Sequence, residues 1–345
     1  MVLGSLCGKF MAFYSYVFSA NYKGFKQKLK KIAKRENKSY YGMLFDTYHS
    51  IFKYGIGLTD YLNYEFYKKD KKKRKTYAGI KIQNKFYEIV SPSAYKKRYT
   101  IKPDFLADFK KYTKRDFVVP EKDSLEEVKK FIENHEFFMS KPYDGLGGAE
   151  VKKVYSKDIK NIEEYFEECK NNRIFLEEVI KQNKELDRLC GASCNTIRIM
   201  TFNNGGVPEI LWAGLRIGNG INPVDNFHAG GMATEIDLET GKLKYPALDK
   251  DLNEYDKHPV SQVKFVGFEV PYFKEVKELV KRASLESDKI LVVGWDIAVT
   301  DKGPVVIEGN RRPGFDVVQV ASRRGRMDII DHVLDEYYKN NLNNK

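Results

Sequence analysis

Residues 305–314 read VVIEGNRRPG and residues 295–300 read WDIAVT, and these two stretches decide the fold. Both are rich in β-branched and aromatic residues, which favour strands. Between them, residues 301–303 (DKG) are typical of a tight turn. The sequence therefore predicts an antiparallel hairpin made of strands at 290–300 and 304–308.

Three oxygen-bearing side chains lie on this hairpin. Glu308 and Asn310 are two positions apart in a strand, so both point to one face. Asp296 lies on the preceding strand, which the hairpin folds back beside Glu308. Two carboxylates and an amide suit Mg²⁺, a hard ion that is usually shared with substrate phosphates. The alternative is a surface hairpin with ordinary exposed acids, which the flanking apolar residues disfavour.

A lysine and a glycine cluster occur together in residues 137–151 (FFMSKPYDGLGGAEV). Glycines let backbone N–H groups close around phosphates, and a lysine adds positive charge. No Gly-Lys-Ser/Thr follows, so the segment is not a Walker A loop. A glycine-rich hairpin turn stays open as the alternative. The candidate phosphate-binding residues are Lys141, Gly145, Gly147 and Gly148.

Residues 174–189 (IFLEEVIKQNKELDRL) run from an apolar strand into two acids and a polar stretch. Such a segment could form a hinge that meets adenine through backbone groups and ribose through an acidic side chain. The pattern does not decide this by itself.

The remainder of the chain mixes helices and strands. Residues 124–134 (SLEEVKKFIEN) predict a helix that begins with a capping box of Ser124 and Glu127. Hairpin strands combined with helices favour an α+β fold over a doubly wound sheet. We expect an N-terminal helical and basic region at 1–75, a linker and central lobe at 76–180, and a C-terminal lobe with the metal site at 181–345.

The 345 residues carry 60 Lys and Arg against 48 Asp and Glu, a net charge of +12. This excess favours anionic partners. The four cysteines have the spacing of neither a disulfide scaffold nor a zinc site. Residues 25–33 (FKQKLKKIA) place apolar side chains on one helical face and lysines on the other. An accessory helical layer is the favoured interpretation, and a basic face for a membrane or an anionic polymer is the alternative.

The order of glycine-rich loop, acidic hinge and Asp … Glu-x-Asn-x-x-Pro-Gly resembles the ATP-grasp superfamily over residues 97–320. Residues 195–198 (NTIR), 225–231 (DNFHAGG) and 308–314 are similar to its sugar-transfer-associated branch, which resembles proteins encoded with polysaccharide biosynthesis genes. The resemblance implies an ATP-grasp fold, in which two α+β lobes grip ATP, with an N-terminal helical extension.

The resemblance also implies residue roles. Lys102 and Lys141 would bind the ATP phosphates, and Arg198 would face the γ-phosphate and an acyl phosphate. Some amino-acid ligases of the superfamily carry an arginine where this chain has Gly294, so that function would fall to Arg198 or Arg216. The adenine hinge would be Glu177, Glu178, Val179 and Ile180, the ribose acid Glu185 or Asp187, and the ligands of two Mg²⁺ ions Asp296, Glu308 and Asn310.

These features predict an ATP- and Mg²⁺-dependent carboxylate–amine ligase that acts through an acyl phosphate. His228, in a loop rich in Gly and Asn, could contact the acceptor or accept a proton from the amine, and an ordinary loop histidine is the alternative. A phosphotransferase acting on a hydroxyl would use the same residues. A non-catalytic basic binding module leaves the acidic hairpin unexplained.

The expected partners are a small-molecule carboxylate and amine, with an acidic glycan as a further candidate, and not nucleic acid. We expect the protein in the cytoplasm; peripheral contact to the inner membrane surface through the basic N-terminal region is the alternative to a purely structural role of that region. The sequence does not identify the carboxylate or the amine.

Overall fold

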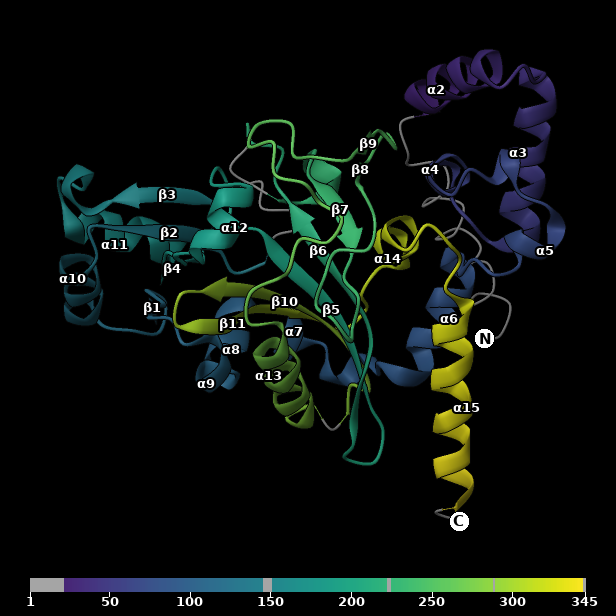
Figure 1. The fold of residues 1–345 in the computed structure, drawn as a ribbon. Helices are drawn as coiled ribbons and strands as arrows, with labels where there is room; N and C mark the ends of the chain where they lie inside the picture. The colour runs from purple at the N-terminus through teal and green to yellow at the C-terminus, as the bar shows by residue number, and fades with distance from the viewer. Residues whose placement is uncertain (1–21, 145–150, 222–224, 288, 344–345) are drawn as a thin grey trace. The chain divides into compact units, whose positions relative to one another are not determined.

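The structure is a computed structural model that describes residues 22–144, 151–221, 225–287 and 289–343 (Figure 1). The chain divides into two compact units. One consists of residues 1–90 together with 314–345, and the other consists of residues 91–313. The three-part division expected from the sequence stays a prediction.

A seven-stranded antiparallel sheet forms the larger part of the unit 91–313, with the strand order β11-β10-β5-β6-β7-β8-β9 (Figure 1). The predicted hairpin is present as its first two strands, and Thr300 pairs with Gly303 at the turn. The strands are β5 (Thr196–Asn203), β6 (Pro208–Ile217), β7 (Met232–Glu235), β8 (Ala247–Asp249), β9 (Glu254–Tyr255), β10 (Val292–Thr300) and β11 (Gly303–Asn310).

The ladder between β10 and β11 changes register once. Ile297 pairs with Val306, whereas Asp296 pairs with Glu308, so Ile307 is the extra residue of a β-bulge. Val306 and Ile297 belong to the hydrophobic core. Glu308 consequently points to the opposite face, together with Asp296.

One face of this sheet is covered by α13 (Phe273–Leu285) (Figure 1). The helix is amphipathic, because its buried residues recur at helical spacing on one side. The helices α8 (Lys102–Asp108) and α9 (Lys110–Thr113) and the residue between them contribute the aromatic side chains of Phe105, Phe109 and Tyr112 to the same core. Its members include Phe105, Phe109, Ile197, Ile199, Val276, Leu279, Val280, Ala283, Trp295 and Ile297.

A four-stranded antiparallel sheet with the order β1-β4-β2-β3 packs with two helices around a separate core. The predicted capping box is present, because Ser124 accepts the N–H of Glu127 and Glu127 accepts the N–H of Ser124. The elements are β1 (Phe117–Val118), α10 (Leu125–Asn134), β2 (Phe137–Pro142), β3 (Lys152–Tyr155), α11 (Ile162–Asn171) and β4 (Ile174–Glu178). Shorter elements of the unit are η2 (Ser93–Tyr95), α7 (Lys97–Thr100), η3 (Ser156–Asp158), α12 (Lys184–Leu189) and η4 (Phe227–Ala229).

The other unit is helical and joins segments from both ends of the chain. Gln319 accepts the N–H of Ala78 at 2.7 Å, and the rings of Phe86 and Phe315 lie edge to face. No helix in the described ranges has the length and apolar character needed to cross a membrane. The α+β class with N-terminal helices is confirmed. The helices are α2 (Tyr22–Arg35), α3 (Tyr40–Tyr54), α4 (Leu58–Asn63), η1 (Phe66–Lys68), α5 (Lys71–Arg74), α6 (Ile80–Val90), α14 (Phe315–Ala321) and α15 (Met327–Asn343).

Candidate active site

The three candidate metal ligands share one face of the seven-stranded sheet. Asp296 on β10 lies opposite Glu308 on β11 and, on its other side, opposite Arg198 on β5. Asn310 lies two positions beyond Glu308 in the same ladder and therefore on the same face. The residues on both sides of Asp296 belong to the core beneath α13. Asp296, Glu308 and Asn310, which we call the acidic row, therefore lie on the other face of the sheet.

The acidic row is a coupled pair of carboxyl groups with an amide beside it. Asp296 and Glu308 share a hydrogen bond, and Asn310 Nδ2 donates to Glu308 Oε1 at 3.2 Å. Burial and the Asp296 carboxylate raise the pKa of Glu308. Burial also opposes ionisation of Asp296, but Arg198 and Arg216 lower its pKa to about 2. A divalent cation would replace the shared proton, so this set of oxygen donors fits Mg²⁺.

Two arginines hold Asp296 from the neighbouring strands. Arg198 forms a two-pronged contact with its carboxylate, in which Nη2 donates to Oδ2 at 2.9 Å. Arg216 Nη2 donates to the same Oδ2 at 2.9 Å and to Thr196 Oγ1 at 2.7 Å. Burial disfavours the charged form of Arg216 and so acts to lower its pKa. The carboxylates of Asp296 and Asp225 outweigh this effect and raise the pKa. Both guanidinium groups are therefore fixed beside the acidic row, where they suit an anionic ligand.

Two lysines belong to the same neighbourhood. Lys141 on β2 pairs with the buried carboxylate of Glu177 on β4. Lys102 begins α8, and its backbone N–H donates to the carbonyl of Tyr143 at 3.0 Å. Burial lowers the pKa of Lys102, the Lys141 ammonium adds to this shift, and Glu308 opposes it. Lys102 is therefore close enough to both Lys141 and Glu308 for their charges to act on it.

Arg115 joins the two sheets and has no signal in the sequence. Its guanidinium donates to the carbonyls of Val306 at 2.8 Å and Ile307 at 3.3 Å, and to Glu177 Oε2 at 3.3 Å. The side chains of Arg115 and Glu177 are each only 4% exposed. Its partners lie 62 to 192 positions away, so local sequence could not identify it.

The expected adenine hinge divides into two kinds of residue. The carboxylate of Glu177 forms ion pairs with Lys141 and Arg115. Oε2 of Glu178 accepts the backbone N–H of Asp116 at 3.3 Å. The next two residues, 179–180, follow the end of β4. Their peptide groups enter none of the hydrogen bonds found in the described part of the chain. They are therefore able to pair with an adenine ring.

Other predicted residues have different surroundings. Glu185 pairs with Arg188 at 2.9 Å, and Asp187 accepts from Gln182 at 3.0 Å, both on or next to α12. His228 is exposed on η4, where its ring meets that of Phe227 edge to face. The roles of these three residues stay predictions. Gly145, Gly147 and Gly148 lie outside the described residues.

Asp225, from the same DNFHAGG segment as His228, is the residue that reaches the arginines. Its Oδ2 accepts the N–H of Thr196 at 3.0 Å and lies 3.6 Å from Arg216 Nε. An acidic residue at the start of a glycine-rich loop was the signal that could have identified it.

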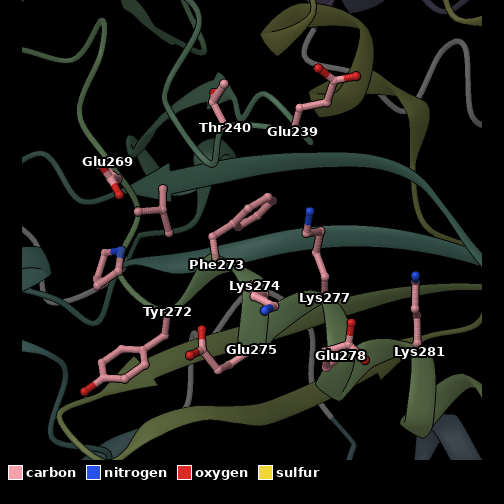
Figure 2. A pocket seen from close by; sticks show the side chains of 12 residues that line it. Glu239, Thr240, Glu269, Tyr272, Phe273, Lys274, Glu275, Lys277, Glu278 and Lys281 are labelled. Atoms are coloured by element: carbon pink, nitrogen blue, oxygen red, sulfur yellow. The ribbon is translucent and has the colours of Figure 1, made fainter.

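A hollow of about 550 Å³ lies beside α13 (Figure 2). Because α13 packs on the core face of the sheet, this hollow is separate from the acidic row, and it contains none of the predicted site residues. Its charged lining mixes both signs: Glu239, Glu269, Glu275, Glu278, Lys274, Lys277 and Lys281.

The model of the sugar-transfer-associated ATP-grasp family matches residues 66–334. The chain belongs to this family. The ATP-grasp fold that the sequence predicts is thereby confirmed, and α2 and α3 precede the matched region. No curated protein matches the sequence.

The solved structures that are similar to this chain include ligases and a synthetase. The ligase PsnB, complexed with a phosphomimetic variant of its minimal precursor, Mg and ADP, is 16% identical with a TM-score of 0.44, over 74% of this chain and 65% of its own. The D-cycloserine synthetase DcsG is 13% identical with a TM-score of 0.42, over 81% and 82%. The D-alanine-D-alanine ligase from Coxiella burnetii is 12% identical with a TM-score of 0.40, over 70% and 59%. This chain thus spans less than two thirds of the PsnB chain, and the likeness concerns the fold alone.

Proposed function

We propose that this protein is an ATP- and Mg²⁺-dependent ligase that joins a carboxylate to an amine and releases ADP. The observation that carries the proposal is the acidic row of Asp296, Glu308 and Asn310, which lies beside Lys102 and Lys141. Oxygen ligands next to two ammonium groups suit a nucleotide triphosphate with its metal. Several structural neighbours are named as ligases, which agrees with this choice.

Each group of the site has a role in the proposal. Bound Mg²⁺ would neutralise the charge that develops on the phosphates during transfer. The lysines add positive charge at the same oxygens, and the free peptide groups after β4 hold the adenine. The full assignment is Asp296, Glu308 and Asn310 for the metal, Lys102, Lys141, Gly145, Gly147 and Gly148 for the phosphates, Glu177, Glu178, Val179 and Ile180 for the hinge, and Glu185 or Asp187 for the ribose.

Arg198 and Arg216 would bind the donor carboxylate. Both guanidinium groups are held beside Asp296, so a carboxylate that pairs with them would lie next to the residues that would hold the metal. The carboxylate takes the γ-phosphoryl group, and an amine then displaces phosphate from the acyl carbon. The chain contributes positioning and charge, and no side-chain nucleophile is required.

The test is Mg²⁺-dependent ADP release, screened over amino acids and uronic acids, singly and in pairs. Glu308→Gln removes a proposed metal ligand, and Glu239→Gln, on the turn beside the hollow, is the matched control. We expect turnover that needs both a carboxylate and an amine, is lost in Glu308→Gln and is kept in Glu239→Gln. Turnover with a hydroxyl acceptor and no amine would favour a phosphotransferase instead, and absence of ATP binding in calorimetry would refute both.

The substrate proposal follows from the family. The family is named for its association with sugar transfer, so we propose that the reaction takes place in the cytoplasm and serves the biosynthesis of cell-surface polysaccharide. The donor would be an amino acid or a uronic acid of an acidic glycan. Turnover with free amino acids and none with uronic acids or their oligomers would contradict the glycan part of the proposal.

The N-terminal helices support a further proposal, contact with an anionic membrane surface. α2 carries seven lysine or arginine residues and no acidic residue. On α3, Tyr41, Phe45 and Phe52 are 79%, 76% and 65% exposed, and their spacing places them on one helical face. A hydrogen bond of 2.7 Å between the hydroxyls of Tyr22 and Tyr48 joins the two helices. Basic residues beside exposed aromatic residues are typical of helices that lie in a membrane interface.

Sedimentation with lipid vesicles tests this proposal. We expect binding to vesicles of phosphatidylcholine mixed with phosphatidylglycerol and none to phosphatidylcholine alone. The double variant Phe45→Ser/Phe52→Ser should lose binding, whereas Val207→Ser, 80% exposed in a turn of the other unit, should keep it. Equal binding of all three proteins would contradict a role for α3.

A further inference from the structure

The loop at residues 225–231 fixes one carboxylate over the arginines of the site. The loop closes on itself, because the N–H of Gly231 donates to the carbonyl of Asn226 at 3.0 Å. A Cβ at Gly231 would lie 2.3 Å from the carbonyl oxygen of Asp225, so a larger residue would open the loop. At its start, Asp225 Oδ2 accepts both the N–H and the hydroxyl of Thr196. Thr196 pairs across strands with Arg216, on the face that carries the acidic row.

Among the described residues, the hydrogen bonds and the ion pair of the Asp225 carboxylate use only one of its two oxygens. Its two hydrogen bonds and its ion pair all use Oδ2, and no hydrogen bond found in the described ranges uses Oδ1. Arg216 Nε is 3.6 Å from Oδ2, beyond hydrogen-bond distance, because this guanidinium donates to Thr196 and Asp296 instead. Asp225 is therefore held in place while Oδ1 stays available to a donor.

The proposed ligation needs such a group. An alkyl amine with a pKa of about 10 enters the site as an ammonium ion at neutral pH, and its nitrogen has no lone pair until it loses a proton. We infer that Asp225 binds the ammonium group of the amine substrate through Oδ1 and accepts its proton. This inference rests on the proposed ligase function.

Transfer of a proton to Asp225 precedes formation of the C–N bond. One N–H bond of the ammonium breaks, its proton moves to Asp225 Oδ1, and the electron pair stays on nitrogen. That pair forms the C–N bond to the acyl carbon, and the C–O bond to phosphate breaks. The phosphate leaves with the electron pair, the nitrogen loses its second proton to phosphate or water, and Asp225 returns its proton to solvent.

The surroundings of Asp225 support a proton acceptor. Burial raises its pKa, Arg216 and Thr196 oppose that shift, and Asp296 adds to it. The thiol of Cys194 is also nearby, and burial raises its pKa to about 12, so it stays neutral. His228, the other candidate from this loop, is exposed. Asp225 is the better placed of the two, because its Oδ2 lies 3.6 Å from Nε of Arg216, and Arg216 donates to Asp296.

The test compares two nucleophiles in Asp225→Asn, using the carboxylate found in the ADP-release screen. Hydroxylamine is uncharged at pH 7 and needs no proton acceptor before attack, whereas the amine substrate does. We expect kcat with the amine to fall by about 10²–10⁴-fold, the range for loss of a general base. The kcat for hydroxamate formation should change less than tenfold, and the affinity for Mg-ADP should be unchanged.

Two variants serve as references. Asp225→Ser also lacks the carboxylate and replaces Asp225→Asn if that variant does not fold. Asp256→Asn changes an exposed acid elsewhere in the unit and should keep both rates. Equal losses with amine and hydroxylamine would overturn the inference, since they would mean that Asp225 acts only by orienting Arg216. Absence of both products from the wild-type protein would instead overturn the ligase function.

Discussion

We predict that Arg115→Met destabilises the protein far more than loss of a surface arginine does. The guanidinium of Arg115 is a shared donor for Glu177 and for the carbonyls of Val306 and Ile307. Methionine can fill much of the same space but donates no hydrogen bond. In the part of the chain that the structure describes, Glu177 would keep Lys141 as its ion-pair partner, and both carbonyls would lose this donor.

The magnitude follows from these contacts. Removing one partner of a buried ion pair costs about 3–5 kcal/mol. The two carbonyls place the expected loss towards the upper end of that range, since an unmade hydrogen bond to a buried group adds to the cost. For a unit of the size of residues 91–313, each kcal/mol lowers Tm by about 2–4 °C, so Tm should fall by about 8–20 °C.

Urea unfolding and thermal unfolding, both followed by circular dichroism at pH 7, measure the loss of free energy of unfolding and the fall in Tm. The matched control is Arg188→Met, because Arg188 also pairs with a glutamate, but both side chains are largely in solvent at 60% and 47% exposure. Exposed pairs contribute about 0–1 kcal/mol, so this variant should unfold close to the wild type. Similar losses in the two variants would refute the reasoning.

The pH dependence of the same measurement gives a second check. Burial opposes ionisation of Glu177, but Lys141 and Arg115 lower its pKa below the ordinary 4.5. A carboxyl group with a lowered pKa in the folded state stabilises the fold above its unfolded pKa, and this contribution disappears as pH falls through the folded pKa. The difference between wild type and Arg115→Met should therefore be largest at neutral pH and shrink below pH 4.5.

Three further substitutions have defined outcomes. Burial and Lys141 lower the pKa of Lys102, so this lysine should lose its charge, and the protein its affinity for ADP, as the pH rises into the alkaline range. Lys102→Arg should move this loss of affinity to higher pH in calorimetric titrations. Gly79→Ala would put a Cβ 2.4 Å from the carbonyl oxygen of Tyr54, and we expect a cost of about 2–3 kcal/mol in thermal unfolding. The amide of Asn195 is buried and donates to three acceptors at 2.8–3.0 Å, so Asn195→Ala should lose about 2–4 kcal/mol in urea.

Those parts of the fold that depend on local pattern could be predicted from the sequence. The hairpin of β10 and β11 follows from two apolar runs around a turn, and the capping box of α10 follows from residues three positions apart. The α+β class follows from the mixture of such elements. The candidate metal ligands were also accessible, because Asp296, Glu308 and Asn310 all lie on that one hairpin.

The side-chain contacts that could not be predicted from the sequence depend on pairing between strands that are far apart in the chain. Lys141 and Glu177 meet only because β2 lies beside β4, and Arg198 meets Asp296 only because β5 lies beside β10. Arg115 has no neighbouring motif at all, so its role appears only once both sheets are formed. Long-range contacts of this kind are set by sheet order, which local periodicity does not encode.

The bulge at Ile307 accounts for the layout of the acidic row. Counted back from the turn, a regular ladder would place Ile307 opposite Asp296. Glu308 would then lie opposite Trp295 and point into the core, where its charge would have no ligand. The extra residue moves Glu308 by one position and brings two carboxyl groups face to face. Arg115 donates to the carbonyl of Ile307, so it stabilises the register on which the site depends. Loss of stability and loss of Mg²⁺-dependent nucleotide binding should therefore occur together in Arg115→Met.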